Sequence, residues 1–244
     1  MKGQKILSVV SIVGLLLALA AEAAVQPISA QAARPAHPLA NAPAVGTAAI
    51  RPGISPDWWA TVQETIRASE YYVTWQEQTY LADLPAAYQA PNRAHNLRTY
   101  FSPDGPIIIP RTWTEETNIP PWRLEIALAA WGRAGALAAP SPATLEAAEN
   151  RIEYRRGEVV EWYRNDENGL KQGFSLSSPP AGEGALQLDL ALRGDLVPQL
   201  NPAGTVVEFQ DDDGKPALRY NGLSVVDAAG RALPARLSLD GATL

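Results

Sequence analysis

Regularly spaced glycines in the last quarter of the chain limit its fold more than any other feature. They follow one another at intervals of 10, 10, 10, 8, 8 and 11 residues, from Gly184 to Gly241. Between them apolar and polar residues alternate, as in 186–190. Turn residues at such intervals, with two-residue periodicity between them, predict consecutive short antiparallel strands. We expect a meander with a last strand at 235–239 and turns at Asp213-Gly214, Asn221-Gly222 and Ala229-Gly230.

The middle of the chain carries further strand patterns. Segments 97–101 and 106–110 flank Asp104-Gly105, and segments 151–155 and 158–163 flank Arg156-Gly157, so each pair predicts a hairpin. Alternation over 122–128 and aromatic content at 71–75 predict two more strands. The Ala-rich stretch 132–149 is expected to be a connection with one helical turn. The expected fold class is mainly β, an antiparallel meander with β-sandwich-like sheets.

One short helix is expected before these strands. Ser55 can cap a helix, Pro56 suits the first helical position, and Asp57 complements the positive end of the helix dipole. Apolar residues then recur at helical spacing, at Trp58, Trp59, Val62 and Ile66.

The first 23 residues have the layout of a secretory signal peptide. Lys2 and Lys5 precede the uncharged, mostly apolar run 6–21, and Ala21-Glu22-Ala23 offers a cleavage site, with 30–32 as a later option. The apolar run is short for a membrane span of about 20 residues. We therefore expect a secreted or cell-surface protein without a membrane span after cleavage.

Composition shifts divide the rest of the chain. Residues 24–54 are rich in Ala and Pro and predict a disordered linker. Residues 55–139 then form an N-terminal β-rich subdomain with the short helix, and 150–244 form the meander subdomain; alternatively, both belong to one continuous domain. Because the chain stops one turn after its last expected strand, we expect a C-terminal partner strand or domain beyond it.

Charge and composition exclude several functions. The net charge is −6 and basic residues do not cluster, which argues against nucleic acid. The chain has no cysteine, which excludes disulfides, thiol catalysis and a lipoprotein anchor. Its two histidines, His37 and His95, are too few for a histidine-rich zinc site. His95 lies in a polar loop and is expected to be a surface residue, and no cofactor is expected.

Acidic residues give two hypotheses. Asp211 and Asp213, followed by Gly214, resemble the start of a calcium loop, although an ordinary charged turn explains them too. A glycosidase would need two carboxylates across a cleft, but no spacing selects a pair. Strand alternation places Glu125, Glu153 and Glu161 on solvent faces. We therefore identify no catalytic residue and expect no enzyme; the carboxylates considered also include Glu115, Glu116 and Asp212.

Aromatic residues concentrate in 58–88, and three tryptophans are candidates for ligand binding. Trp58, Trp59 and Trp75 could stack on sugar rings if they are exposed. The alternative, which we favour, is that the aromatic residues of this segment belong to the core.

Several distinctive runs point to a known family. They are 75–78, 88–101, 153–157, 161–163, 169–174, 218–223 and 230–235. These runs resemble the N-terminal region of exported bacterial cell-surface proteins that carry FG-GAP (integrin-α-like) or related β-propeller repeats. The resemblance covers about residues 57–244. It implies a structural module that further strands and the propeller repeats would follow, and it carries no catalytic residue over.

These observations lead to one expected function and two alternatives. The expected function is an exported, non-catalytic, β-rich surface, adhesion or assembly module whose partner is an unknown protein or glycan at the cell surface. The first alternative is a carbohydrate-binding or carbohydrate-active extracellular domain. The second is a calcium-stabilised extracellular module.

Overall fold

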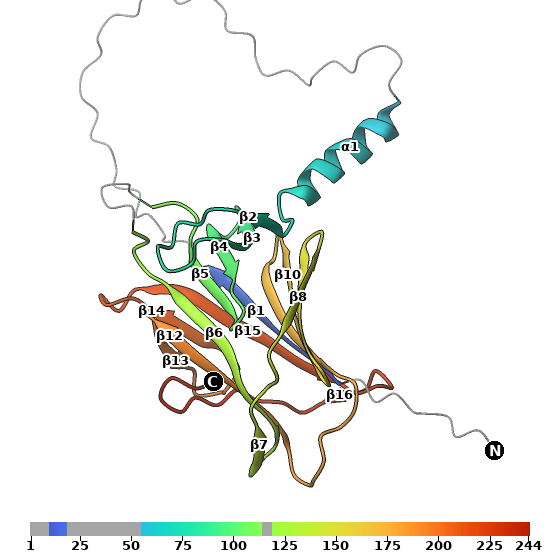
Figure 1. Cartoon of the computed structure of the whole chain (residues 1–244), viewed down its shortest axis with the longest axis vertical. Coiled ribbons are helices and arrows are strands. Elements are labelled where there is room, and N and C mark those ends of the chain that lie inside the picture. Colours follow the sequence, from blue (N-terminus) through green and yellow to red (C-terminus); the bar gives the residue numbers. More distant parts are fainter. Residues whose placement is uncertain (1–9, 19–54, 114–118) are drawn as a thin grey trace, which may run out of the picture. The chain divides into compact units, whose positions relative to one another are not determined.

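The computed structural model describes residues 10–18, 55–113 and 119–244, which form antiparallel sheets and one short helix (Figure 1). This confirms the expected mainly β, sandwich-like fold class. The expected linker 24–54 lies outside the described residues. So do Glu115, Glu116 and the signal-peptide residues on either side of 10–18.

Sheet B, the seven-stranded sheet, consists mostly of hairpins that follow one another along the chain. The predicted hairpin around Asp104-Gly105 is confirmed, and the strand predicted at 122–128 overlaps β6, which begins at Leu124 and continues to Arg133. The strand predicted at 71–75 is shorter and later, at β2. The sheet contains β2 (Thr74–Gln76), β3 (Ala87–Asn92), β4 (Leu97–Phe101), β5 (Pro106–Pro110), β6 (Leu124–Arg133) and β12 (Leu186–Gly194) in that spatial order, with β7 (Ala136–Ala138) also paired to β6.

Sheet A, the nine-stranded sheet, combines the C-terminal strands with one strand from the start of the chain. The predicted hairpin around Arg156-Gly157 is confirmed here. The spatial order is β13 (Val197–Leu200), β14 (Val207–Gln210), β15 (Pro216–Val226), β1 (Val10–Ala18), β11 (Gly169–Leu176), β10 (Val159–Asp166), β9 (Arg151–Arg156) and β8 (Thr144–Ala148), with β16 (Ala232–Leu233) also paired to β15.

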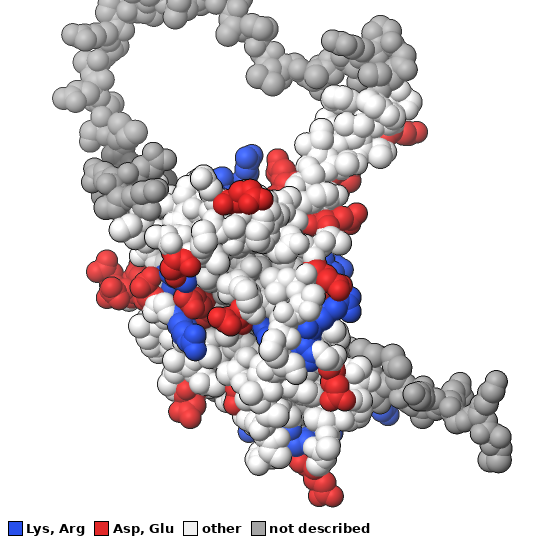
Figure 2. Space-filling model, viewed as in Figure 1, with Lys and Arg blue, Asp and Glu red and all other residues white. Residues whose placement is uncertain are grey.

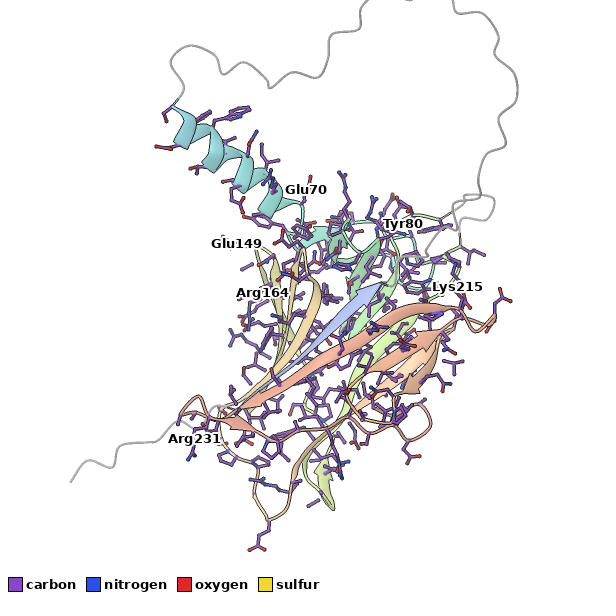
Figure 3. All side chains as sticks on the ribbon, turned by 180° about the vertical axis from the view of Figure 1, so that it is seen from behind. Glu70, Tyr80, Glu149, Arg164, Lys215 and Arg231 are labelled. Carbon is purple, nitrogen blue, oxygen red and sulfur yellow. The ribbon has the colours of Figure 1, made fainter. Side chains whose placement is uncertain are left out.

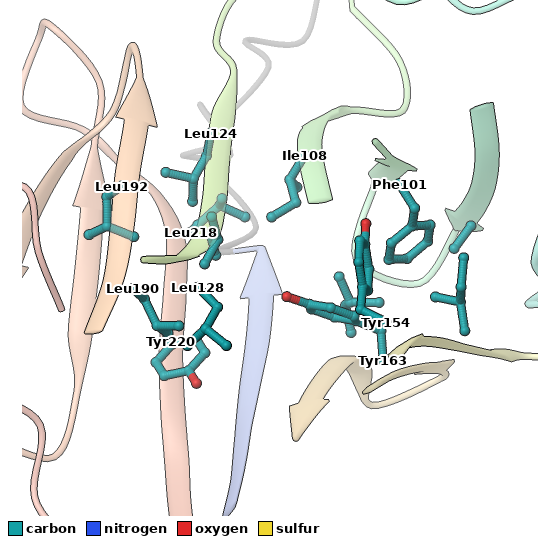
Figure 4. Packing of buried hydrophobic residues seen from close by; sticks show 14 of the residues in the cluster. Phe101, Ile108, Leu124, Leu128, Tyr154, Tyr163, Leu190, Leu192, Leu218 and Tyr220 are labelled. Atoms are coloured by element: carbon teal, nitrogen blue, oxygen red, sulfur yellow. The ribbon is translucent and has the colours of Figure 1, made fainter. Parts of the chain in front are cut away.

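One hydrophobic core contains residues of both sheets (Figure 4). Phe101 of β4 packs against Tyr163 of β10, with ring centroids 5.5 Å apart. A buried amide pair adds a polar link, because Asn92 Nδ2 donates to Asn165 Oδ1 at 2.9 Å. The segments 55–139 and 150–244 also share a sheet, since β12 pairs with β6. Their strands therefore pack as one body.

The helix α1 (Pro56–Ser69) begins where the sequence predicts. The backbone N–H of Trp58 donates to Ser55 Oγ at 3.1 Å, which is the expected N-terminal cap. No helix among the described residues is long and apolar enough to cross a membrane.

Three sequence predictions are wrong. Gly222 lies inside β15 and has a φ of 72°, so Asn221-Gly222 is an irregularity within a strand rather than a turn. The segment 132–149 contains β7 and β8 instead of a helical turn. Residues 235–239 form no strand. The chain instead returns to β12, where the backbone N–H of Leu244 donates to the carbonyl of Leu190 at 3.0 Å.

Candidate functional site

The most unusual feature of the fold is the position that β1 occupies. β1 pairs antiparallel with β11 over Val10–Leu16 and with β15 over Ser11–Ala18. β11 and β15 do not pair with each other. Within the described residues, β1 therefore provides the strand pairing between the two halves of sheet A. We call the position between β11 and β15 the strand slot.

The strand slot is filled by a segment that is distant in the sequence. The apolar segment 6–21, which the sequence predicts to be part of a signal peptide, contributes all nine residues of β1. Figure 1 shows this strand, in blue, running beside the C-terminal β15. A continuous apolar run is typical both of a signal peptide and of a strand buried in a sheet, so the sequence alone gives no sign of this pairing.

A chain of buried polar side chains lies beneath the slot. Tyr220 of β15 donates its hydroxyl hydrogen to Gln172 Oε1 at 3.2 Å, and Gln172 is on β11. Gln172 Nε2 donates to the hydroxyl oxygen of Tyr163 at 2.7 Å. Tyr220 and Tyr163 accordingly lie on opposite sides of β1 in Figure 4. The Tyr220–Gln172 hydrogen bond therefore joins the two walls of the slot across the place where β1 runs.

Two glycines face each other in the slot. Gly14 is the register partner of Gln172, and the pairing with β15 shifts between Val13 and Leu15. Ser224 pairs with Val13 and Asn221 with Leu15, which leaves Gly222 and Leu223 opposite the single residue Gly14. A glycine with positive φ at a two-against-one mismatch is characteristic of a β-bulge. The wall of the slot formed by β15 is thus irregular near the hydrogen bond between Tyr220 and Gln172.

The outer face of the same strands is basic and aromatic. Arg151, Arg164 and Lys171 are register neighbours on β9, β10 and β11, and Lys171 is in turn opposite Leu15 of β1. The guanidinium carbon of Arg151 lies 4.4 Å from the centre of a Trp162 ring. Arg164 projects from β10 at the side of the molecule in Figure 3. Lys171 makes no ion pair with any described residue.

The polar chain ends at a fully buried carboxyl group, Glu161. Its Oε1 accepts hydrogen bonds from the hydroxyl of Tyr163 at 2.5 Å and from Gln172 Nε2 at 3.0 Å. Arg156 Nε lies 3.8 Å from its Oε2. Burial raises the pKa of the Glu161 carboxyl above its ordinary value, and the two hydrogen bonds and the Arg156 charge partly oppose this shift.

The buried location of Glu161 corrects the prediction that it faces solvent, since its exposed fraction is 0%. The prediction relied on the alternation of residues along the strand, with the charged residue assigned to the solvent face. The large apolar residues at alternate positions of the same strand were the signal for the opposite face. Glu161 shares its face of β10 with Val159 and Tyr163, which are both fully buried.

The tryptophans considered for ligand binding are exposed, which corrects the preference for a core role. Trp75 is 52% exposed and Trp58 is 53% exposed, while Trp59 lies beside Trp58 on α1. Trp75 packs edge-on against Tyr88 and donates its Nε1–H to Glu77 Oε1 at 3.0 Å. The structure places Trp75 on β2 in sheet B and does not bring it into contact with the strand slot.

Tyr80, which is labelled in Figure 3, is another exposed aromatic residue. It lies between β2 and β3 of sheet B. Its ring packs edge-on against Trp113 with centroids 5.6 Å apart, and the Arg98 guanidinium carbon lies 4.2 Å from its centre. Exposed aromatic rings beside polar groups are suitable for stacking on a sugar.

The acidic residues considered for calcium form a hairpin turn between β14 and β15. Asp211 Oδ1 accepts hydrogen bonds from the backbone N–H groups of Asp213 and Lys215, at 3.1 and 2.8 Å. The Asp211 side chain therefore stabilises its own turn. Over the described residues, no group of three or more acidic or histidine side chains is close enough together to hold a metal ion.

The cavity beside the β4–β5 turn is lined in part by a small ion-pair cluster. Arg123 Nη1 lies 2.8 Å from Asp83 Oδ2, and its Nη2 lies 2.8 Å from Glu125 Oε1. The hydrogen bond from Arg123 lowers the pKa of the Asp83 carboxyl, so this group is ionised at neutral pH and holds no proton to donate. Figure 2 shows acidic and basic side chains interspersed over one face of the molecule.

The remaining sequence candidates have local partners. Glu153 pairs with Arg151 at 2.9 Å, and His95 Nε2 lies 3.0 Å from the backbone carbonyl oxygen of Glu167.

No family model matches the chain, and neither a curated protein nor a solved structure does.

Proposed function

We propose that the chain is an exported, non-catalytic β-sandwich module that assembles with a partner at the cell surface through the strand slot. One observation carries this proposal: β1, an internal strand of sheet A, comes from the segment with the layout of a signal peptide. Removal of residues 1–23 during export would leave β11 and β15 with unpaired backbone groups along the slot. Such edges pair readily with another extended chain.

The packing of the two sheets supports a module that survives this removal. The core includes residues of β4, β6 and β12 in sheet B, and the walls of the slot contribute Leu176, Leu218 and Tyr220 to it. Both walls therefore remain attached to sheet B through side-chain packing. The slot would open without separating the halves of sheet A from the rest of the molecule.

Export with cleavage is tested by expressing the full chain in a bacterial host and weighing the exported protein by intact mass spectrometry. We expect a mass corresponding to a start at residue 24, or at residue 33 if the later site is used. A matched variant, Leu15→Arg, places a charge inside the apolar run and should remain in the cytoplasm uncleaved. Exported protein that retains residues 1–23 would contradict the proposal.

Carbohydrate binding is a second candidate, favoured by the exposed Trp75 with its Nε1–H held by Glu77. A flat exposed indole beside a carboxylate can stack on a sugar ring while the carboxylate accepts hydrogen bonds from hydroxyl groups. A glycan array with the wild type and Trp75→Ala tests this candidate, and Trp162→Phe, on the opposite sheet, is the matched control. Binding that is absent, or unchanged in Trp75→Ala, removes it.

A further inference from the structure

The residues around the strand slot restrict which strand can fill it. This inference rests on the proposed function. We propose that the slot binds one strand of a partner protein, about nine residues long, with glycine opposite Gln172 and an acidic residue opposite Lys171. In the present structure β1 occupies the position that this strand would take, so the register of β1 defines the requirements.

The requirement for glycine follows from the hydrogen-bonded polar side chains beneath the slot. The hydrogen bond between Tyr220 and Gln172 connects β15 to β11 beneath the intervening strand. Residues directly opposite each other in an antiparallel ladder share a face of the sheet. A side chain at the position of Gly14 would therefore share the buried face with Gln172 and compete with Tyr220 for the same space. Glycine leaves that space to the hydrogen bond.

The neighbouring positions on this face favour apolar residues. Positions 12 and 16 of the ladder are opposite Phe174 and Leu170, which are both buried in the core. A polar residue at either position would lose its hydration without gaining a partner. The buried face of the accepted strand is thus apolar, glycine, apolar at alternate residues, a pattern that Ile12, Gly14 and Leu16 satisfy.

The preference for an acidic residue comes from the outer face. Position 15 is opposite Lys171, next to Arg164 in the same row, and Lys171 has no ion-pair partner among the described residues. Opposite charges on directly paired residues stabilise an antiparallel sheet. The present occupant has an uncharged residue, Leu15, at this register position.

The slot is tested on the full chain with a protease recognition sequence inserted between residues 24 and 54. After cutting, the β1 segment is held only by non-covalent contacts and can exchange with a labelled peptide of residues 8–20, followed by fluorescence anisotropy. We expect the Gly14→Val peptide to bind at least about tenfold more weakly than the wild-type peptide. The volume-conserving Leu17→Ile peptide, changed at an outer position, should bind within about threefold of it. Equal binding of the wild-type and Gly14→Val peptides would overturn the glycine requirement.

Two further measurements of peptide binding test the acidic preference and the role of Gln172. The Leu15→Glu peptide should bind about three- to fivefold more tightly than the Leu15→Lys peptide. In a Gln172→Ala protein, the Gly14→Val peptide should regain most of its lost affinity, because the group it displaces is gone. If the Gly14→Val change weakens peptide binding by the same factor for the wild-type and the Gln172→Ala protein, the proposed role of Gln172 is overturned.

The identity of the occupant is tested with the exported, cleaved protein. It should bind the labelled peptide directly, and light scattering should show a monomer before the peptide is added. A stable dimer would assign the slot to a second copy of this chain. Failure to bind the peptide would mean that the slot is closed in the cleaved protein. Either result would overturn the proposal that the slot binds a strand of a partner protein. If instead the exported protein retains residues 1–23, the proposed function fails while the peptide results on the cut chain still stand.

Discussion

Sheets A and B contribute to one core but are assembled in different ways. Most neighbours in sheet B are consecutive in the chain, from β2 to β6, so each pairing closes a short loop. Sheet A places β1 between strands that lie more than a hundred residues later. Sheet B also has an apolar interior at Ile108, Leu124 and Ile126, whereas sheet A has Glu161 and Gln172 there. The two halves of sheet A are therefore paired only through the distant strand β1 among the described residues, whereas the distant strand of sheet B, β12, pairs with β6 at the edge of that sheet.

The strongest test of this comparison is Val13→Pro in the middle of β1. Proline removes a backbone donor and does not fit an internal strand, so the free energy of unfolding should fall by about 3 kcal/mol or more. Thr144→Pro, at the first residue of the edge strand β8, is the control and should cost much less. Thermal unfolding followed by circular dichroism measures both variants. Equal losses would mean that sheet A does not depend on β1.

A pair of glycine substitutions compares how tightly the two sheets are packed. A Cβ at Gly105, beside sheet B, would lie 2.1 Å from the carbonyl oxygen of Ile126, which is backbone and cannot move freely. A Cβ at Gly173 in sheet A would lie 2.1 Å from the side chain of Trp162. Gly105→Ala should therefore cost about 3 kcal/mol and Gly173→Ala about 1–2 kcal/mol in urea unfolding. The reverse order would show that Trp162 is the more rigid neighbour.

A smaller effect is expected from the buried carboxyl group of sheet A. Because burial raises the pKa of Glu161 in the folded state, the folded protein binds this proton more tightly than the unfolded chain does. The resulting stability is present below the unfolded pKa, whose ordinary value is 4.5, and is lost as the pH rises through the folded pKa.

Glu161→Gln removes this titration. The fall in the free energy of unfolding as the pH rises above 4.5 should become shallower, by about 1.4 kcal/mol in total for each unit by which the pKa is raised. Chemical unfolding at a series of pH values measures the slope. A variant with the wild-type slope would mean that Glu161 does not change its proton affinity on folding.

The smallest effect concerns calcium. Since Asp211 Oδ1 already accepts two backbone hydrogen bonds, millimolar calcium and EDTA should give the same melting temperature. A higher melting temperature in calcium, abolished by Asp213→Asn, would support the calcium-stabilised module instead.

The sequence was most informative where pairing is local. The hairpins at 97–110 and 151–166 follow from alternation around glycine turns, and the helix follows from Ser55, Pro56 and Asp57. Asn221-Gly222 has the same residues as a hairpin turn, and only the pairing of β1 with β15 makes it an irregularity within a strand. The strand slot was not predictable from local patterns, because it depends on contacts between residues 10–18 and strands that lie more than a hundred residues later. Glu161 was misplaced because the alternation of its strand was interpreted with the charged residue on the solvent face, whereas its neighbours Val159 and Tyr163 on the same face are buried.

The distance in sequence between β1 and its partners has a consequence for the order of events during synthesis. β1 is synthesised before β11 and β15, which lie more than a hundred residues later in the sequence. Closing such large loops is slow compared with forming local hairpins. Residues 10–18 would thus stay unpaired while sheet B forms its hairpins, until β11 is made. In the proposed export of this protein, that delay gives the secretion machinery time to engage the segment before sheet A can enclose it.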